Sequence, residues 1–370
     1  MTHDFAPKLA AVLTGYCRPV QPGDHVAINT STAAAPLVEA LVEAVLKRGG
    51  YPDVNLSLPN IIELILTHTP EALFDYENPV SMLRLNHADV WFTIIADSNT
   101  KALATIPPDR MARFQQGRRA YIERYLERCD NDDLRWNITA WPTQGAAQEA
   151  EMGYMAYTEF MYNAAGLNHD DPVAYWTAFR DRQDRLINWL GGKQRLDVRG
   201  PGIELSLNMA GRTWVNCYGV RNFPDGEIFT SPVEDSVNGW VEFNLPSVYN
   251  GREVNGVRLV FKDGVVVEAS ADKGEDYLLS QLDLDDGARR LGEFAIGTNE
   301  GIDRFTRSIL FDEKMGGTIH MALGHNAGGA GGTNTSAIHW DMVHKMQDGG
   351  EIVVDGELFY RAGEFMVDPV

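Results

Sequence analysis

Cysteine is scarce in this sequence, and negative charge outnumbers positive charge. The 370 residues include only three cysteines, Cys17, Cys129 and Cys217, far apart along the chain. A sparse, odd set of this kind predicts reduced thiols and not a disulfide framework. The net charge of −20 argues against nucleic-acid or anionic-membrane partners, because their phosphates would repel an acidic surface.

Long apolar runs and a basic leader are also missing. No stretch approaches the roughly 18 apolar residues that span a bilayer. The first residues, MTHDFAPKLAAVL, contain no basic segment ahead of an apolar core, which is the pattern of a secretory signal. We therefore expect a cytoplasmic protein that acts on a small molecule or a short peptide.

The first part of the chain alternates between strand and helix patterns. Apolar runs at His25–Asn29 and Pro52–Leu58 flank a stretch of helical periodicity that ends at Gly49-Gly50. This βαβ pattern predicts a parallel sheet. No glycine fingerprint of a dinucleotide site follows the first strand. With further strands at 88–96 and 136–141 and one long helix at 108–129, residues 1–143 predict an α/β domain.

The remainder predicts a helical connection and then a β-rich domain. Helical patterns at 146–164 and 172–190 fill residues 144–195. From residue 196 onward, short apolar runs alternate with turns, so residues 196–370 predict a C-terminal α+β domain rich in strands. Lys262-Asp263-Gly264 is typical of a hairpin turn. The strands expected there cover 203–209, 213–218, 240–244, 257–262, 265–271, 292–296, 318–323, 337–343, 351–354 and 358–361, with a helix at 277–286.

Histidine and aspartate side chains are concentrated in the stretch Gly316–Val343. Residues two apart in a strand point to the same face, so His339 and Asp341 share one face and Trp340 fills the other. His320 lies between Ile319 and Met321 in the same way. This arrangement predicts either part of a metal site or three polar residues on a solvated sheet face, and the stretch alone does not decide between them.

Four motifs in a fixed order carry a more specific signal. They are NFPDGEIFTSP, RLGEFAIGTN, DEK followed by GTIHMALG, and GGTNTSAIHWDM. Together they resemble the M29 family of metalloaminopeptidases, the thermophilic aminopeptidase T group. The resemblance covers residues 211–370 well and the N-terminal domain more loosely.

The resemblance implies a fold, a cofactor and an assembly. The family has an N-terminal α/β domain and a C-terminal β-rich domain that carries two divalent metal ions, and it forms homodimers with a secluded cavity. The ligands implied here are Glu227, Glu293, His320, His339 and Asp341. This mixed set suits Zn²⁺, Co²⁺ or Mn²⁺. Two such ions against three carboxylates leave about one net positive charge, which suits a bridging hydroxide that attacks an amide.

One position departs from the family. Its catalytic tyrosine, seven residues after the first metal histidine, is replaced by Ala327. His325 and Asn326 are the nearest candidates to polarise the substrate carbonyl instead, and Tyr360 is a candidate from elsewhere in the chain. Glu313 and Lys314, in the DEK triplet, either orient ligands or form an exposed salt bridge.

Four functions remain open. The sequence favours a dinuclear hydrolase that releases N-terminal amino acids. Changed chemistry at Ala327 would instead give a hydrolase of a non-peptide amide, or a non-catalytic binding protein. The last alternative is a ring-cleaving Fe(II) dioxygenase, whose site would need only His320, His339 and Asp341, so that retention of both glutamates argues against it.

Overall fold

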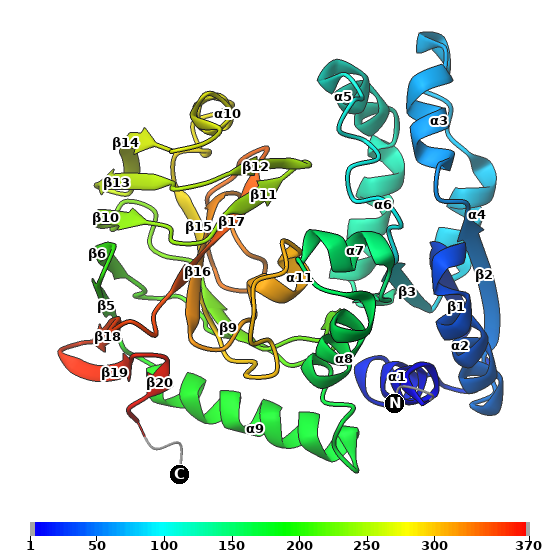
Figure 1. Ribbon diagram of the computed structural model, residues 1–370, viewed down its shortest axis with the longest axis horizontal. Coiled ribbons are helices and arrows are strands. Elements are labelled where there is room, and N and C mark those ends of the chain that lie inside the picture. The colour runs from blue at the N-terminus through cyan, green and yellow to red at the C-terminus, as the bar shows by residue number, and fades with distance from the viewer. Residues whose placement is uncertain (1–3, 368–370) are drawn as a thin grey trace. The chain divides into compact units, whose positions relative to one another are not determined.

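The computed structural model describes residues 4–367 and divides into two compact units (Figure 1). Unit 1 comprises Met1–Val173 and Gly219–Phe223, and unit 2 comprises Ala174–Tyr218 and Pro224–Val370. Unit 1 holds a parallel sheet with helices, and unit 2 is built mainly from antiparallel strands. The expected combination of an α/β part and a β-rich part is confirmed.

Unit 1 is built on a five-stranded sheet in the order β2-β1-β3-β4-β8, with every pair parallel. Its strands are β1 (His25–Ser31), β2 (Tyr51–Ser57), β3 (Val90–Ile95), β4 (Arg135–Ala140) and β8 (Asn222–Phe223). Helix α2 (Ala35–Lys47) forms the crossover between β1 and β2, as the βαβ pattern predicts. The short strand β8 comes from a later part of the chain, and no strand pattern predicts it.

Helices surround this sheet, and two of the expected ones are interrupted. They are α1 (Phe5–Val12), α3 (Ile61–His68), α4 (Pro79–His87), α5 (Pro108–Gly117), α6 (Arg119–Asp130), α7 (Gln144–Glu149) and α8 (Tyr154–Ala164). The single helix expected at 108–129 is wrong, because the chain breaks at Gly117 where it meets the backbone of Phe74. The helix expected at 146–164 is likewise two helices, and Glu151 between them has a φ of 56°.

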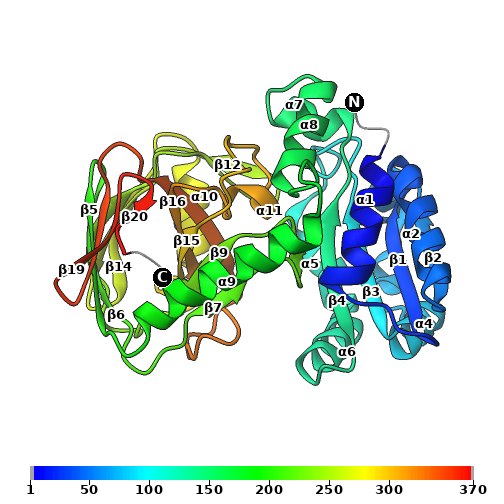
Figure 2. The same cartoon turned by 90° about the horizontal axis from the view of Figure 1, so that it is seen from below.

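Unit 2 contains two antiparallel sheets and the long helix α9 (Pro172–Leu190) (Figure 2). The eight-stranded sheet has the order β14-β13-β10-β6-β5-β18-β19-β20, and the five-stranded sheet has the order β17-β16-β15-β9-β7. The first sheet comprises β5 (Arg195–Gly200), β6 (Ile203–Asn208), β10 (Asn238–Glu242), β13 (Arg258–Lys262), β14 (Val265–Ser270), β18 (Glu351–Val354), β19 (Glu357–Arg361) and β20 (Glu364–Phe365). The second comprises β7 (Val215–Cys217), β9 (Glu227–Thr230), β15 (Leu291–Gly297), β16 (Thr318–Gly324) and β17 (His339–Lys345). A hairpin, β11 (Ser247–Tyr249) and β12 (Arg252–Val254), and helices α10 (Glu275–Leu282) and α11 (Ile309–Asp312) complete the unit.

One apolar core joins the two sheets of unit 2 with α9 and α10. The five-stranded sheet contributes Ile228, Phe294, Met321 and Trp340 to it, and the other sheet contributes residues such as Leu205. All seven residues of β15 and all seven of β16 are buried, so both faces of these central strands are covered. The face that is turned away from the core therefore holds its polar side chains out of water.

The cysteines and the helices of the described residues can be compared with the expectations from the sequence. Within the described residues, Cys17, Cys129 and Cys217 form no disulfide and remain thiols, as expected. Within residues 4–367, no helix combines the length and the apolar character needed to cross a membrane.

The break at Gly117 makes a testable prediction for unit 1. A Cβ at this position would lie 1.8 Å from the carbonyl oxygen of Phe74. Helix propensity alone would make Gly117→Ala stabilising by about 0.5–1 kcal/mol, whereas the clash should make it destabilising by about 1–3 kcal/mol. Urea unfolding measures the difference. Gly153→Ala is the control, because nothing lies within 4 Å of its Cβ position; a Gly117→Ala variant as stable as the parent would contradict this packing.

Candidate metal centre

Strand register gathers polar side chains on the covered face of the five-stranded sheet. Ala322 on β16 pairs with Glu293 on β15 and with Asp341 on β17, so the two carboxylates flank a methyl group. Glu227 on β9 pairs with Gly297, which has no side chain. Ala322 thus leaves space between Glu293 and Asp341, whereas a Cβ at Gly297 would meet the carbonyl oxygen of Met315 at 2.1 Å. The alternation that puts Trp340 into the core holds His339 and Asp341 on the opposite face, as the sequence predicted.

The two histidines lie between these carboxylates. Nε2 of His320 is 3.2 Å from Oε2 of Glu227 and 3.3 Å from Oε1 of Glu293. Nε2 of His339 is 3.4 Å from Oε2 of Glu293 and 3.6 Å from Oδ1 of Asp341. Each oxygen of Glu293 therefore faces a different imidazole. The structure brings together all five residues that the sequence singled out as ligands.

Glu293 belongs to two groups of possible metal ligands. One group is Glu227, Glu293 and His320, and the other is Glu293, His339 and Asp341; the ligand atoms of each lie within 4.8 Å of one another. Three buried atoms of these residues have no hydrogen-bond partner, namely Oε2 of Glu227, Nδ1 of His320 and Oδ1 of Asp341. Buried polar atoms without partners are costly. A divalent cation would satisfy the carboxylate oxygens, so the residues fit a metal.

Backbone groups orient the ring of His339 and the strand that carries Asp341. Nδ1 of His339 donates to the carbonyl oxygen of His325 at 2.8 Å, which turns Nε2 toward Glu293 and Asp341. In that position Nε2 can carry a proton without metal, or offer its lone pair to a metal ion once the proton is lost. That carbonyl lies against Gly292, where a Cβ would come within 2.1 Å of it. The hydroxyl of Ser247 donates to the carbonyl of Asp341 at 3.0 Å. These contacts could not be predicted from the sequence, because glycine and serine at positions 292 and 247 do not suggest a metal site.

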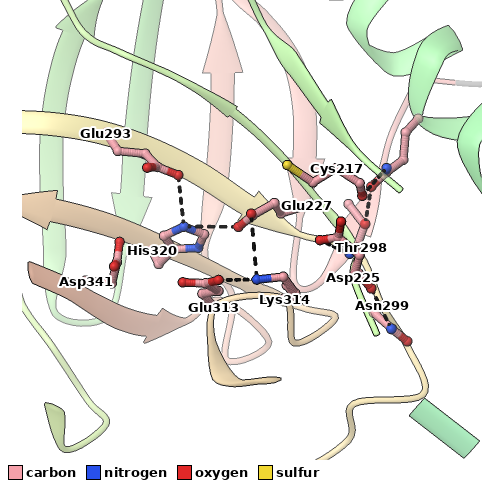
Figure 3. A network of polar contacts seen from close by, with 12 residues as sticks. Cys217, Asp225, Glu227, Glu293, Thr298, Asn299, Glu313, Lys314, His320 and Asp341 are labelled. Carbon is pink, nitrogen blue, oxygen red and sulfur yellow. Dashed lines mark hydrogen bonds and ion pairs between the residues drawn. The ribbon is translucent and has the colours of Figure 1, made fainter. Parts of the chain in front are cut away.

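A buried ion pair adjoins the ligands. Lys314 is 0% exposed, and its ammonium contacts Glu313 and lies 3.8 Å from Oε1 of Glu227. Figure 3 shows Glu293, His320, Glu227, Lys314 and Glu313 as one continuous chain of polar contacts. The exposed salt bridge considered from the sequence is therefore wrong. Glu313 also forms a third possible ligand group with His320 and Asp341.

A fourth possible ligand group lies at the edge of the site. Cys217 on β7 pairs with Glu227 in register, and the two residues form a group with Asp225. Burial raises the pKa of the Cys217 thiol, and the nearby carboxylates of Glu227 and Asp225 raise it further. The thiol is therefore held in its neutral form. No motif predicts this placement, because Cys217 lies ten residues before Glu227 and belongs to none of the four motifs.

The electrostatics of the site reflect burial and mutual repulsion. Burial raises the pKa of Glu227 to about 8, although Lys314 acts in the opposite direction. Burial also acts to raise the pKa of Glu293, but hydrogen bonds from His320 and His339 outweigh it and leave the pKa below its usual value. Burial lowers the pKa of both imidazoles, yet the surrounding carboxylates raise it to about 9 for His320 and about 12 for His339. Without metal, the histidines hold protons that compensate the carboxylates.

The loop after β16 contains Ala327 and the two residues proposed from the sequence to replace the missing tyrosine, His325 and Asn326. Ala327 is buried at 7% exposure and packs with Phe229, Ala295 and Ala330 on the ligand-bearing face. The side-chain amide of Asn326 donates to the carbonyl of Asn334 at 2.8 Å, and His325 contributes its carbonyl to His339.

Tyr360 lies elsewhere in the unit. It is on β19 in the eight-stranded sheet, fully buried in the apolar core with its ring against Phe365. It therefore does not stand in for the missing tyrosine.

The chain resembles known proteins over nearly its whole length. A sequence model of the family described as thermophilic metalloprotease (M29) matches residues 3–365. The chain belongs to the M29 family. It is 31% identical to aminopeptidase 2 of Geobacillus stearothermophilus over 82% of this chain and 79% of that protein. It is 27% identical to aminopeptidase T of Thermus aquaticus over 86% and 83% of the two chains.

Solved structures agree with this M29 membership. Wild-type AmpT from Thermus thermophilus superposes with a TM-score of 0.87 at 25% identity and covers 99% of this chain and 100% of its own. A 2,5-dihydroxypyridine dioxygenase from Pseudomonas putida KT2440 superposes with a TM-score of 0.57 at 14% identity over 98% and 96% of the chains, which shows a shared fold alone. The resemblance read from the four motifs is confirmed, and the chain is a hydrolase of a metalloprotease family.

The shifted pKa values predict how this M29 chain responds to pH after treatment with a chelator. The pKa of Glu227 is raised from 4.5 to about 8 and that of His320 from 6.5 to about 9, so the folded state holds protons that the unfolded chain releases. Stability should therefore fall as pH rises from about 5 to 9. The lowered pKa values of Glu293 and Asp341 act only at more acidic pH.

Thermal unfolding at a series of pH values measures this effect. The Glu227→Gln variant should show a shallower decline, because it lacks one of the groups whose raised pKa causes the decline; His339, whose pKa is raised to about 12, contributes to it in parent and variant alike. Metal-loaded protein should decline less than the stripped protein, since metal displaces those protons. A stripped protein whose stability is flat or rising over this range would contradict the assignment.

Proposed function

We propose that this M29 chain holds two divalent metal ions through Glu227, Glu293, His320, His339 and Asp341. The observation that carries the proposal is the position of Glu293, whose two oxygens face His320 on one side and His339 on the other. A carboxylate shared between two ligand groups is suited to bridge two ions. Mixed carboxylate and imidazole ligands favour Zn²⁺, Co²⁺ or Mn²⁺.

The proposed reaction is release of the N-terminal residue from a short peptide, or cleavage of a related amide. Divalent ions at such a site activate water and polarise a carbonyl group. The protein's own contribution is to hold the ligands rigidly on covered strands and to exclude bulk water from β15 and β16. The neutral Glu313–Lys314 pair leaves the charge balance of three carboxylates against two divalent ions unchanged.

The names of the relatives support the peptide substrate, and Ala327 supports a changed specificity. Because Ala327 packs on the ligand-bearing face, a residue at this position lies beside the site. An alanine cannot donate a hydrogen bond to a developing oxyanion, and loss of such a donor costs about 10²–10³ in rate in other enzymes. A non-peptide amide with its own polarised carbonyl is therefore the second candidate substrate. The imidazole of His325 and the amide of Asn326, which precede Ala327 directly in the chain, are our candidates to donate instead, and Asn326 would keep one amide hydrogen besides the one it gives to Asn334.

The dioxygenase alternative receives less support. A single Fe(II) ion would need only His320, His339 and Asp341. It would leave Glu293 without a metal ion and Glu227 with only Lys314, which already pairs with Glu313. Since burial of unpaired carboxylates is expensive, the retained pair favours two ions.

The assembly and location are proposed from the family and the sequence. We expect a cytoplasmic homodimer, and light scattering of the purified protein should give twice the chain mass of 41.1 kDa. A monomer at micromolar concentration would remove the dimer from the proposal.

Hydrolysis of aminoacyl anilides and unrelated amides, with Zn²⁺, Co²⁺ or Mn²⁺ added in turn, tests the proposed reaction. Glu293→Gln should abolish activity on every substrate, because both ions lose a ligand. If specificity has changed, the parent should be nearly inactive on leucyl anilide, and Ala327→Tyr should raise that rate at least tenfold. A parent that is already fast and gains nothing from the tyrosine would be an ordinary aminopeptidase. An enzyme inactive on every amide despite bound metal would overturn the hydrolase assignment.

A further inference from the structure

Unit 1 contains a cavity that the proposed metal centre does not use. Its volume is about 840 Å³, and it lies against the sheet near the carboxyl ends of β1, β2 and β3. Asn29 on β1 pairs in register with Asn55 on β2 and with Thr93 on β3, so three polar side chains line the cavity in one row. Because β2 and β3 flank β1 on opposite sides, this is a point where the strand order reverses. Open parallel sheets bind ligands at such points.

Aromatic rings form the walls of this cavity. Trp91 and Tyr125 meet edge to face with centroids 6.2 Å apart, and Phe74 and Phe114 do so at 6.4 Å. Tyr121 also lines the space. Gly117 holds the break between α5 and α6 against the backbone of Phe74, which fixes the helices that carry these rings. A cavity of this size with aromatic walls and a few polar groups is typical of small-molecule sites.

Two guanidinium groups, those of Arg84 and Arg118, line the cavity of this otherwise acidic protein. Nε of Arg84 pairs with Asp53 at 2.6 Å, but its Nη2 is buried with no hydrogen-bond partner. The guanidinium of Arg118 lies over the rings of Phe114 and Tyr121, at 5.4 Å and 5.7 Å from their centroids. Among the described residues, no carboxylate forms a salt bridge with Arg118. One buried donor and one uncompensated charge therefore border the same aromatic cavity.

We propose that this cavity is a second binding site, for a small molecule that combines an aromatic ring with an anionic group. The rings would stack on the aromatic part, and Arg84 and Arg118 would bind the carboxylate, sulfonate or phosphate. The site lies wholly within unit 1 and requires neither metal ions nor hydrolysis. This proposal can therefore be wrong while the proposed function is right, and the reverse. Glu77 also lines the cavity and disfavours ligands with several negative charges.

A matched pair of fluorescent probes tests the proposal on the full-length protein. 1-Anilinonaphthalene-8-sulfonate carries an aromatic system and an anion, and N-phenyl-1-naphthylamine has the same rings without the sulfonate. The anionic probe should bind more tightly than the neutral one. Arg118→Met should weaken the anionic probe at least tenfold and change the neutral probe less than twofold.

Arg119→Met is the matched control, because Arg119 is the next residue, pairs with Glu123 at 2.6 Å and does not line the cavity. Arg84→Met should weaken the anionic probe as Arg118→Met does, and thermal unfolding of each variant reports whether it is folded. Glu227→Gln should leave both probes unaffected, which separates this site from the metal centre. Equal binding of the two probes, or equal effects of Arg118→Met and Arg119→Met, would overturn the proposal.

Discussion

The cost of holding carboxylates together away from water governs the architecture of unit 2. Glu227 and Glu293 are 5% and 6% exposed, and both face the same imidazole within 3.3 Å. Ligand atoms of the two carboxylates lie within 4.8 Å of each other, and two like charges at that distance repel by about 3 kcal/mol even at an effective dielectric near 20. Lys314 contributes one buried positive charge, and it is already shared with Glu313. Without metal, protons on the histidines and on Glu227 must supply the remaining compensation, and divalent cations would replace them.

The scaffold keeps these groups in place through features that have no chemistry of their own. Ala322 stands where a larger side chain would fill the site, and Gly297 allows the backbone of Met315 to approach, since a Cβ there would lie 2.1 Å from its carbonyl oxygen. Gly292 allows the carbonyl of His325 to approach and bind the ring of His339. The opposite face of the same strands packs Phe294 and Met321 into the apolar core, so a shift of one residue in register would exchange core and ligands. The strand register that stabilises the core therefore also sets the geometry of the site.

The sequence predicted the elements that depend on local pattern and missed those that depend on distant contacts. The βαβ unit, helix 172–190 and the alternation around Trp340 follow from periodicity, and the structure confirms them. The break at Gly117 could not be foreseen, because it arises from contact with Phe74, 43 residues earlier. Burial of Lys314 could not be predicted from the sequence either, because three charged residues in a row are typical of an exposed turn. The convergence of the five proposed ligands was expected from the ordered motifs and not from any single residue, and their role in binding metal stays a prediction.

Metal content of reconstituted protein, determined by elemental analysis after removal of unbound ions, tests the central claim most directly. The account predicts two divalent ions per chain for the parent. It predicts one for Glu227→Gln, which removes a ligand from one group alone, and fewer than one for Glu293→Gln, which removes the shared ligand. A parent with a single ion per chain, or a Glu293→Gln variant that keeps two, would contradict the claim that Glu293 joins two metal sites.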